Sequence, residues 1–207
     1  MNERDKGTEE KIVQAARAVF LRKGYNGARM QEIADEAGTN KALLHYYFRS
    51  KDRLFEVIFL QSFSQFFPKV STILTGNEPL PVKVVSFVEH YIDLLRENPY
   101  LPQFILSEVS RDPESVPRLF QAAGLNPEWF MGQLANIGQG VFPPGSDVRH
   151  FILNMLSMCI FPFAARPLLT RVMFSGDDAA YENFLDQRKR EVSSACLQLL
   201  SPTAGQR

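Results

Sequence analysis

Apolar residues recur at the spacing of an amphipathic helix in two segments near the start of the chain. Thr8 can cap the first segment, because Glu9 and Glu10 follow it in the first turn, where acidic side chains are favourable. Gly24 and Gly38 stop the two segments. The apolar positions are Ile12, Ala15, Ala16, Val19 and Phe20 in the first segment and Met30, Ile33, Ala34 and Ala37 in the second.

A third short helix is predicted directly after the second. Asn40 is a suitable N-cap, and Leu44 and Phe48 lie one turn apart on the face that would turn inward. Helices this short are unstable alone, so the three must bury their apolar stripes against one another. The pattern therefore predicts a small three-helix unit that ends near residue 50.

The rest of the chain carries longer apolar segments at helical spacing, and no alternating strand pattern competes with them. Most of the 13 prolines fall between these segments. The sequence predicts an all-α protein, in which residues 1–50 form a helix-turn-helix unit and residues 51–207 a larger helical domain. The helices of that domain are expected at residues 51–67, 80–97, 100–110, 114–123, 127–139, 147–165 and 178–200.

The second and third short helices, joined by a brief turn that contains glycine, have the plan of a helix-turn-helix, whose second helix enters the DNA major groove. With Leu44 and Phe48 inward, the outward positions are Lys41, Ala42, Leu43, His45 and Tyr46. Lys41 and His45 can donate to N7 or O6 of a purine, and the apolar residues between them can contact a thymine methyl group.

Cations gather near this predicted helix pair although the whole chain is neutral. Lysine plus arginine and aspartate plus glutamate number 23 each, but residues 1–53 hold 11 cations and 8 acids, a formal charge of +3. Tyr47, Arg49 and Lys51 follow the outward positions and can bind phosphates. A tight helix pair also occurs in proteins that do not bind DNA, and a Tyr-Tyr-Phe run often packs, so the pattern alone leaves both readings open.

Other classes of protein find little support in the sequence. Cys159 and Cys196 lie in apolar helical patterns without CxxC spacing, so we expect two buried thiols in the reducing cytoplasm. The first 11 residues are highly charged and do not resemble a signal peptide. The most apolar segment, residues 151–169, contains polar residues and prolines, so no membrane span is expected. No catalytic triad, phosphate-binding glycine loop or metal-ligand pair is apparent, so we expect neither an enzyme nor a cofactor.

Residues 20–55 resemble the DNA-binding domain of the TetR family of bacterial transcriptional regulators. The resemblance covers about the first quarter of the chain, and an all-α remainder is also typical of the family. The matching positions are Phe20, Gly24, Tyr25, Ile33, Ala34, Ala37, Gly38, Lys41, Leu44, Tyr47, Phe48, Ser50, Lys51, Leu54 and Phe55.

The resemblance implies the role of individual residues in DNA binding. It implies base contacts by Lys41, Ala42, Leu43 and His45 and phosphate contacts by Tyr47 and Lys51. The second helix departs from the family pattern because it opens with Ala28 and Arg29 in place of a Ser or Thr cap. A phosphate contact there would have to come from the Arg29 side chain. A tyrosine is common where this chain has His45, which leaves the base preference open.

The larger domain is rich in aromatic residues, since 15 of the 17 phenylalanines lie beyond residue 53. They can line an apolar cavity or simply fill a core. The resemblance implies a cavity for an inducing ligand, and His90, Phe104 and Trp129 are the candidate lining residues. His90 lies on the polar stripe of its helix, so it can equally be solvated.

The last two long helices are amphipathic and suited to pair with their copies in a four-helix bundle. The resemblance implies that they form a homodimer interface, and the alternative is that they only cap the monomer. The candidate interface residues are Phe151, Met155, Cys159, Tyr181, Phe184, Val192 and Leu199.

Together these features predict a ligand-responsive transcriptional regulator. We expect a repressor that a mostly apolar small molecule releases from a near-palindromic operator. The alternative is a DNA-binding regulator whose larger domain binds a protein partner instead of a ligand. The expected partners are double-stranded operator DNA, a small-molecule effector and a second copy of the chain, with no membrane.

Overall fold

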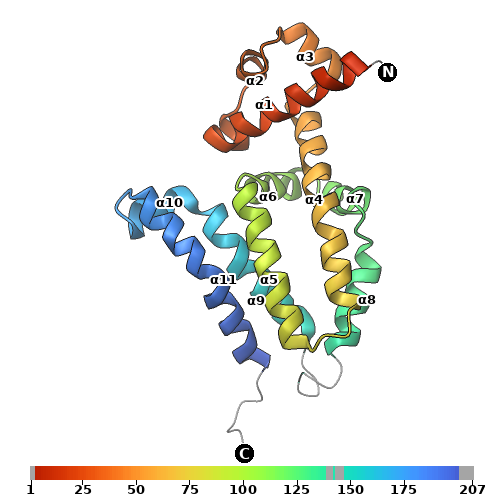
Figure 1. Ribbon diagram of the computed structural model, residues 1–207, viewed down its shortest axis with the longest axis vertical. Helices are drawn as coiled ribbons and strands as arrows, with labels where there is room; N and C mark the ends of the chain where they lie inside the picture. Colours follow the sequence, from red (N-terminus) through yellow and green to blue (C-terminus); the bar gives the residue numbers. More distant parts are fainter. Residues whose placement is uncertain (1–2, 139–141, 143–146, 201–207) are drawn as a thin grey trace, which may run out of the picture. The chain divides into compact units, whose positions relative to one another are not determined.

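The structure is a computed structural model that describes residues 3–138, 142 and 147–200 of the 207 (Figure 1). Within these residues every regular element is an α-helix, which confirms the predicted all-α class. The helices form two compact units. Unit 1 contains residues 1–65 and 98–124, and unit 2 contains residues 66–97 and 125–207.

Unit 1 is built from the short N-terminal helices and two helices from later in the chain. Its elements are α1 (Glu3–Gly27), α2 (Met30–Glu36), α3 (Lys41–Tyr47), the first part of α4 (Lys51–Thr75), α6 (Leu101–Arg111) and α7 (Ser115–Ala122). Gly24 interrupts α1 with φ of 67°, a left-handed conformation that favours glycine. Asn40 caps α3 as predicted, since its side chain accepts a hydrogen bond from the Leu43 backbone N–H at 2.8 Å.

An aromatic cluster explains why α6 belongs to unit 1. Phe55 of α4 stacks on Phe104 of α6 with ring centroids 3.9 Å apart, and Phe20, Tyr25 and Tyr100 surround this pair. All five rings are buried. Aromatic pairs of this kind add about 0.5 to 1.5 kcal/mol each beyond the burial of their area. The compact units therefore do not divide between residues 50 and 51, where the sequence pattern changes.

Arg17 of α1 joins three segments of unit 1. Its half-buried guanidinium donates to α4 and to the residues that follow α5. The acceptors are Asn98 Oδ1 (2.9 Å), Gln61 Oε1 (3.2 Å), Ser62 Oγ (3.3 Å), Tyr100 Oη (3.4 Å) and the Ile58 carbonyl (3.5 Å). Ser62 and Tyr100 also donate to the buried Asn98 side chain. One cation thus organises the point at which the chain returns from unit 2 into unit 1.

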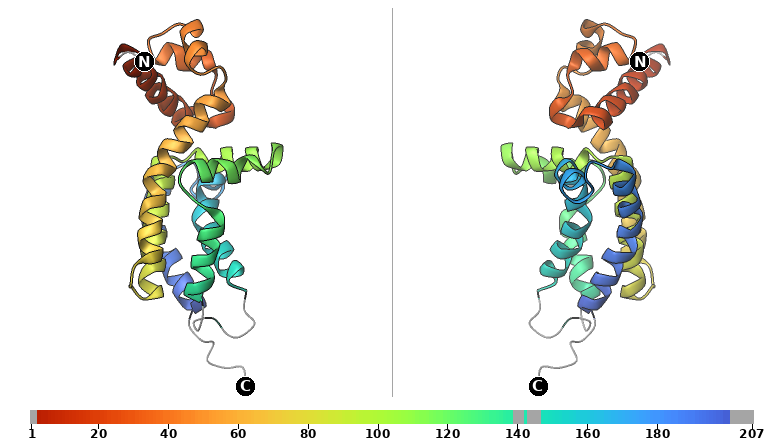
Figure 2. Two further views of the ribbon diagram at one scale, coloured as in Figure 1. Left: turned by 90° about the vertical axis from the view of Figure 1, so that its right-hand side faces the viewer. Right: turned by 90° about the vertical axis from the view of Figure 1, so that its left-hand side faces the viewer.

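Unit 2 is a helical bundle around α5 (Figure 2). Its elements are the second part of α4, α5 (Leu80–Glu97), α8 (Pro127–Gly138), α9 (Val148–Ala164), α10 (Arg166–Met173) and α11 (Asp178–Leu200). The central helix α5 packs against both α9 and α11, and these two pack against each other. Seven residues of α5 are buried, so its apolar face is unusually wide.

A proline inside α9 ties this helix to α11. Pro162 has no backbone N–H, so the Met158 carbonyl one turn earlier lacks its usual intrahelical donor. Arg188 of α11 supplies the donor instead, with its Nη2 at 2.9 Å from the Met158 oxygen. Tyr181 of α11 donates to the Pro162 carbonyl at 2.5 Å. The irregularity in α9 is therefore satisfied by two side chains of its neighbour.

The observed helices differ from the predicted ones at three places. Helix α1 begins at Glu3, so Thr8 lies inside the helix and does not cap it. Helix α4 does not end at residue 67 but continues through Pro68 to Thr75. The burial of Phe66, Val70 and Leu74 holds the helix in this form despite the missing hydrogen bond. Helix α10 was not predicted at all, since its Pro167 suggested a break. Proline is tolerated there because it lies in the first turn, where no N–H donor is required.

Within the described residues, no single helix is both long and apolar enough to cross a bilayer. Helices α9 and α10 pass that test only as a pair, and the chain bends by 75° between them.

The Arg17 cluster predicts a specific loss of stability. Arg17→Ala should lower the free energy of unfolding by about 1 to 3 kcal/mol, because it removes charge-assisted hydrogen bonds at a half-buried site. Helical circular dichroism during urea denaturation measures this change. Arg22→Ala is the matched control, since Arg22 on the same helix forms only an exposed pair with Glu36. Equal shifts for the two variants would show that the cluster has no special role.

Candidate nucleic-acid interface and ligand cavity

Helix α3 presents one face to the core of unit 1 and the other to solvent. Leu44 is fully buried and Phe48 is 2% exposed, as the inward assignment of these residues predicts. The four residues predicted to face bases, Lys41, Ala42, Leu43 and His45, are all exposed. Tyr46 beside them is 78% exposed, so it does not pack into the core. The structure therefore leaves a mixed cationic, apolar and aromatic surface on α3.

Three cations near α3 have no acidic partner. Among the residues that the structure describes, no carboxylate lies within ion-pair distance of Arg29, Lys41 or Arg49. Lys41 also stands in the first turn of α3, where the helix dipole disfavours a cation by about 0.3 to 1 kcal/mol. Neighbouring cations are paired instead, as in Arg22 with Glu36 at 2.6 Å. These exposed charges are therefore available to an anionic partner.

Arg29 precedes α2 and its side chain is exposed. Its backbone N–H donates to the Glu32 carboxylate at 3.3 Å, and Lys23 binds the same carboxylate at 2.6 Å. A capping box has two hydrogen bonds, and this one runs from the N-cap backbone to the N3 side chain. The other requires an acceptor on the N-cap side chain, and an arginine side chain has donors only. The guanidinium therefore takes no part in capping α2.

Lys51 differs from Arg29, another predicted phosphate contact, because its ammonium group donates hydrogen bonds within the protein. Its ammonium donates to the carbonyls of Tyr25 (2.8 Å) and Ala28 (3.2 Å) and lies 4.5 Å from the centre of the Tyr25 ring. Lys51 thus binds the last turn of α1 and the residue that follows this helix. Tyr47 is half-buried and packs edge-on against Tyr46, with ring centroids 5.3 Å apart.

A polar network that was not predicted lies behind these residues. Tyr25 donates to Asp52, and Arg111 at the end of α6 binds the same carboxylate at 2.9 Å. Arg111 also forms a bidentate pair with the buried Glu108 at 2.7 and 2.9 Å. Burial and the hydrogen bond to Asp52 raise the pKa of Tyr25. The pattern of apolar positions could not predict this network, because Tyr25, Asp52 and Arg111 are polar and lie far apart in the sequence.

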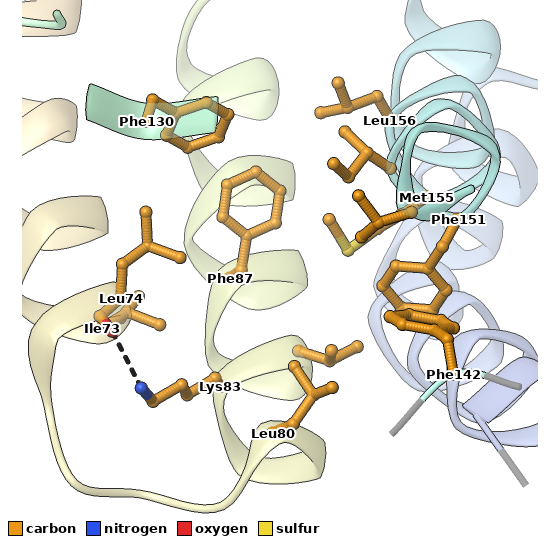
Figure 3. Close-up of a pocket in the computed structure, with 13 residues that line it drawn as sticks. Ile73, Leu74, Leu80, Lys83, Phe87, Phe130, Phe142, Phe151, Met155 and Leu156 are labelled. Carbon is orange, nitrogen blue, oxygen red and sulfur yellow. Dashed lines mark hydrogen bonds between the residues drawn. The ribbon is translucent and has the colours of Figure 1, made fainter. Parts of the chain in front are cut away.

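Unit 2 contains an apolar cavity among α4, α5, α8 and α9 (Figure 3). Phe87 lies between the α4 side chains and those of α9. The volume of the cavity is about 50 Å³. Among the described lining residues Lys83 alone is charged, and its ammonium is directed to the Leu74 carbonyl at 2.8 Å. The lining residues are Ile73, Leu74, Leu80, Lys83, Val84, Phe87, Phe130, Phe142, Val148, Phe151, Ile152, Met155 and Leu156.

The structure places the three predicted pocket residues away from this cavity. Phe104 belongs to the aromatic cluster of unit 1 and is 1% exposed. His90 donates through Nδ1 to the Ser86 carbonyl of its own helix at 2.7 Å. Trp129 is 36% exposed, whereas its neighbour Phe130 lines the cavity. The apolar spacing of Leu80, Val84 and Phe87 on α5 was the signal that could have identified the lining.

Most of the predicted dimer-interface residues lie inside their own subunit. Phe151, Met155, Cys159, Tyr181 and Val192 are all buried in unit 2, and the first two line the cavity. Such side chains have little surface left for a partner. Of the remaining two, Phe184 is half-buried and Leu199 is 51% exposed. Burial raises the pKa of Cys159 to about 12 and that of Cys196 to about 11, so both are protonated thiols.

Sequence comparison identifies the family. Residues 12–58 match the family model of bacterial regulatory proteins, tetR family, which spans the helix pair, its supporting helix α1 and the start of α4. The chain belongs to the TetR family of bacterial regulatory proteins and is a transcriptional regulator of that type. This confirms the resemblance seen in residues 20–55.

Similarity extends beyond the N-terminal helices. The chain is 23% identical over 177 residues to the probable HTH-type transcriptional regulator YttP of Bacillus subtilis (strain 168), covering 81% of this chain and 82% of that one. It is 28% identical over 166 residues to the HTH-type transcriptional repressor NicS of Pseudomonas putida, covering 74% of each. The transcriptional regulator FadR from Bacillus subtilis, solved in complex with stearoyl-CoA, shares the fold, with a TM-score of 0.61, 19% identity and coverage of 96% and 99%.

The different surroundings of Arg29 and Lys51 predict different effects of their removal. Both Arg29→Ala and Lys51→Ala should weaken binding to all DNA sequences and reduce the salt dependence by about one charge per half-site. Only Lys51→Ala should also lower the free energy of unfolding, by about 1 to 3 kcal/mol, because it releases two backbone carbonyls. Salt titrations of DNA affinity and urea denaturation separate the two effects. A similar loss of stability in Arg29→Ala would contradict the assignment.

Proposed function

We propose that this protein is a repressor that binds a near-palindromic operator as a homodimer and is released by a mostly apolar small molecule. DNA binding is assigned to residues 1–50, and ligand binding and dimerisation to residues 51–207. The observation that carries the proposal is the presence, in one chain, of an exposed cationic α3 surface and an apolar cavity. Both features suit a regulator whose DNA affinity depends on a ligand.

The exposed face of α3 supports DNA reading in the major groove. Lys41 and His45 supply polar contacts, and Ala42 and Leu43 supply apolar contacts to base edges. Arg29 lies at the start of α2 and is available to a phosphate. Within the described part of the chain, no carboxylate lies within ion-pair distance of Lys41 or Arg29, so DNA binding breaks no described ion pair at these positions.

The outer face of α9 offers a surface for a second copy. Leu153 is 62% exposed and Phe161 is 59% exposed. Each follows a buried residue, Phe151 and Cys159 respectively, by two positions, which is a rotation of about 200° around the helix. Exposed apolar residues continue on α10, where Val172 is 70% exposed. Large apolar side chains in such numbers are typical of an interface. A two-fold dimer would cover them on both subunits at once.

The chemistry of the cavity defines the effector class. Its lining is apolar apart from Lys83, so a buried charge or unpaired polar group would be costly there, and a hydrocarbon or aromatic body is preferred. The cavity volume of about 50 Å³ exceeds the roughly 10 to 15 Å³ that one water molecule requires, but the cavity is small for an organic ligand. A larger ligand must therefore displace lining side chains, and this displacement is a means of changing the structure. The FadR complex with stearoyl-CoA is compatible with an apolar effector in this fold.

Helix α4 is the proposed route of coupling. It is continuous from Lys51 to Thr75, with Leu54 and Phe55 in the core of unit 1 and Leu74 in the lining of the cavity. A ligand that moves Leu74 therefore acts on the helix that also packs against α1, through Phe55 and Phe20. Such a ligand favours release only if it binds the released form more tightly than the DNA-bound form.

Selection from a pool of random DNA duplexes tests the proposed DNA binding. The expected product is a near-palindrome whose half-site centres lie about one helical turn, or slightly more, apart, because a two-fold dimer places two α3 helices in successive major grooves. Footprinting of the selected duplex measures the spacing. A single unrepeated half-site bound by a monomer would contradict the dimer, and no enriched sequence would contradict DNA recognition itself.

The proposed interface predicts the effect of placing a charge on α9 or α10. Phe161→Glu and Val172→Glu should each convert a dimer to a monomer, because the carboxylates would be desolvated at the centre of the contact. Sedimentation velocity measures the mass in solution. Leu106→Glu is the matched control, since Leu106 is a similarly exposed leucine (56%) on α6 of unit 1. Dissociation by the control alone would place the interface elsewhere.

The cavity predicts a variant that binds DNA but does not respond. Leu156→Trp should fill the space within unit 2 and leaves the residues of α3 unchanged, so operator affinity should stay within about twofold while release by the ligand is lost. Homologous n-alkanols and n-alkanoic acids of increasing chain length serve as probes, and fluorescence anisotropy of labelled operator reports release. Unchanged release from the variant would show that the effector binds at another place. No release by any probe from the native protein would favour a protein partner over a ligand.

A further inference from the structure

The imidazole of His45 is fixed by a hydrogen bond to the backbone. Its Nδ1 lies 3.0 Å from the carbonyl oxygen of Arg49, in the segment between α3 and α4. A carbonyl oxygen can only accept a hydrogen bond, so Nδ1 must carry the proton. The neutral ring then has its lone pair on Nε2, and the side chain is exposed to solvent. Among the described residues, none makes a hydrogen bond to Nε2.

We propose that His45 reads an exocyclic amino group, the N6 amine of adenine or the N4 amine of cytosine, through Nε2 as an acceptor. These two amines are the hydrogen-bond donors that the bases present in the major groove. Guanine N7 and O6 and thymine O4 are acceptors, and they would face the lone pair of Nε2 without a proton between them. The hydrogen bond to Arg49 therefore selects a class of base at this position.

The orientation of the ring strengthens the choice. A histidine free to rotate and exchange its proton could donate to guanine as readily as it accepts from adenine. Here the change to the other tautomer would remove the donor from the Arg49 carbonyl and place two acceptors 3.0 Å apart. The specificity arises from the backbone contact as well as from the identity of the side chain. A tyrosine hydroxyl in its place would both donate and accept and would impose no such choice.

This inference depends on the proposed DNA binding and deepens it. The test uses the operator obtained by selection at pH 8. The base opposite His45 is identified as the position whose preference is lost in His45→Phe, a variant that keeps a ring but has no acceptor. Tyr46→Phe, on the adjacent exposed residue, is the control and should leave that preference intact.

Removal of the amino group from the base gives the decisive comparison. Purine replaces adenine, or pyrimidin-2-one replaces cytosine, at the identified position of the duplex. The native protein should lose about three- to tenfold in affinity, as expected for one hydrogen bond, beyond the loss that His45→Phe shows on the same duplex. Because both proteins meet the same weakened base pair, its effect cancels in the ratio.

The outcomes separate this inference from the function on which it depends. Equal losses for the two proteins, or a preference for guanine or thymine opposite His45, would overturn the assignment of Nε2 while DNA recognition stands. Failure of the native protein to select any sequence would overturn the proposed function and this inference with it. The inference is supported if the native protein prefers adenine or cytosine at this position and loses affinity when the amino group is removed, whereas His45→Phe does not show this extra loss.

Discussion

The organisation of unit 1 depends on the hydrogen bonds between Arg17 of α1 and the chain around Asn98. The chain leaves unit 1 within α4 and returns at Asn98, and there the Arg17 guanidinium, Ser62 and Tyr100 all donate to one buried amide oxygen. This junction holds the start of α6 beside α1 and α4, so Phe104 can stack on Phe55. The helices that carry the DNA-binding surface are thus part of a larger core than the first 50 residues.

Some charged side chains of unit 1 form contacts within the fold, whereas others are exposed and available to a partner. Lys51, Asp52 and Arg111 are used within unit 1, where they join α1, α4 and α6. Arg29 and Lys41 have no acidic partner among the residues that the structure describes. In unit 2, Arg188 compensates the carbonyl freed by Pro162. Of the described residues that line the cavity, Lys83 alone is charged, and it donates to an α4 carbonyl. Local energetics therefore favour an anionic partner for unit 1 and an apolar one for unit 2.

The sequence predicted features that depend on neighbouring residues and failed where distant packing decides. The Asn40 cap, the break at Gly24 and the inward position of Leu44 follow from local rules, and all three were found. Both faces of α9 are apolar, so periodicity could not tell the cavity side with Phe151 from the outer side with Phe161. On α8, Trp129 and Phe130 are adjacent aromatic residues that point about 100° apart around the helix. The sequence does not indicate which of them faces the cavity, because that depends on how α8 packs in three dimensions. The packing of Phe104 into unit 1 depends on a contact 49 positions away in sequence, with Phe55, and had no local signal.

The central claim is that ligand binding in unit 2 and operator binding by unit 1 oppose each other. Calorimetric titration of the alkyl compound that releases DNA most strongly, into the free dimer and then into the operator complex, tests it directly. Couplings of this kind are usually about 1 to 3 kcal/mol, so the ligand should bind the complex roughly five- to 150-fold more weakly, by the same factor by which it weakens operator binding. Equal ligand affinity in the two states would contradict the account, even if the compound occupied the cavity.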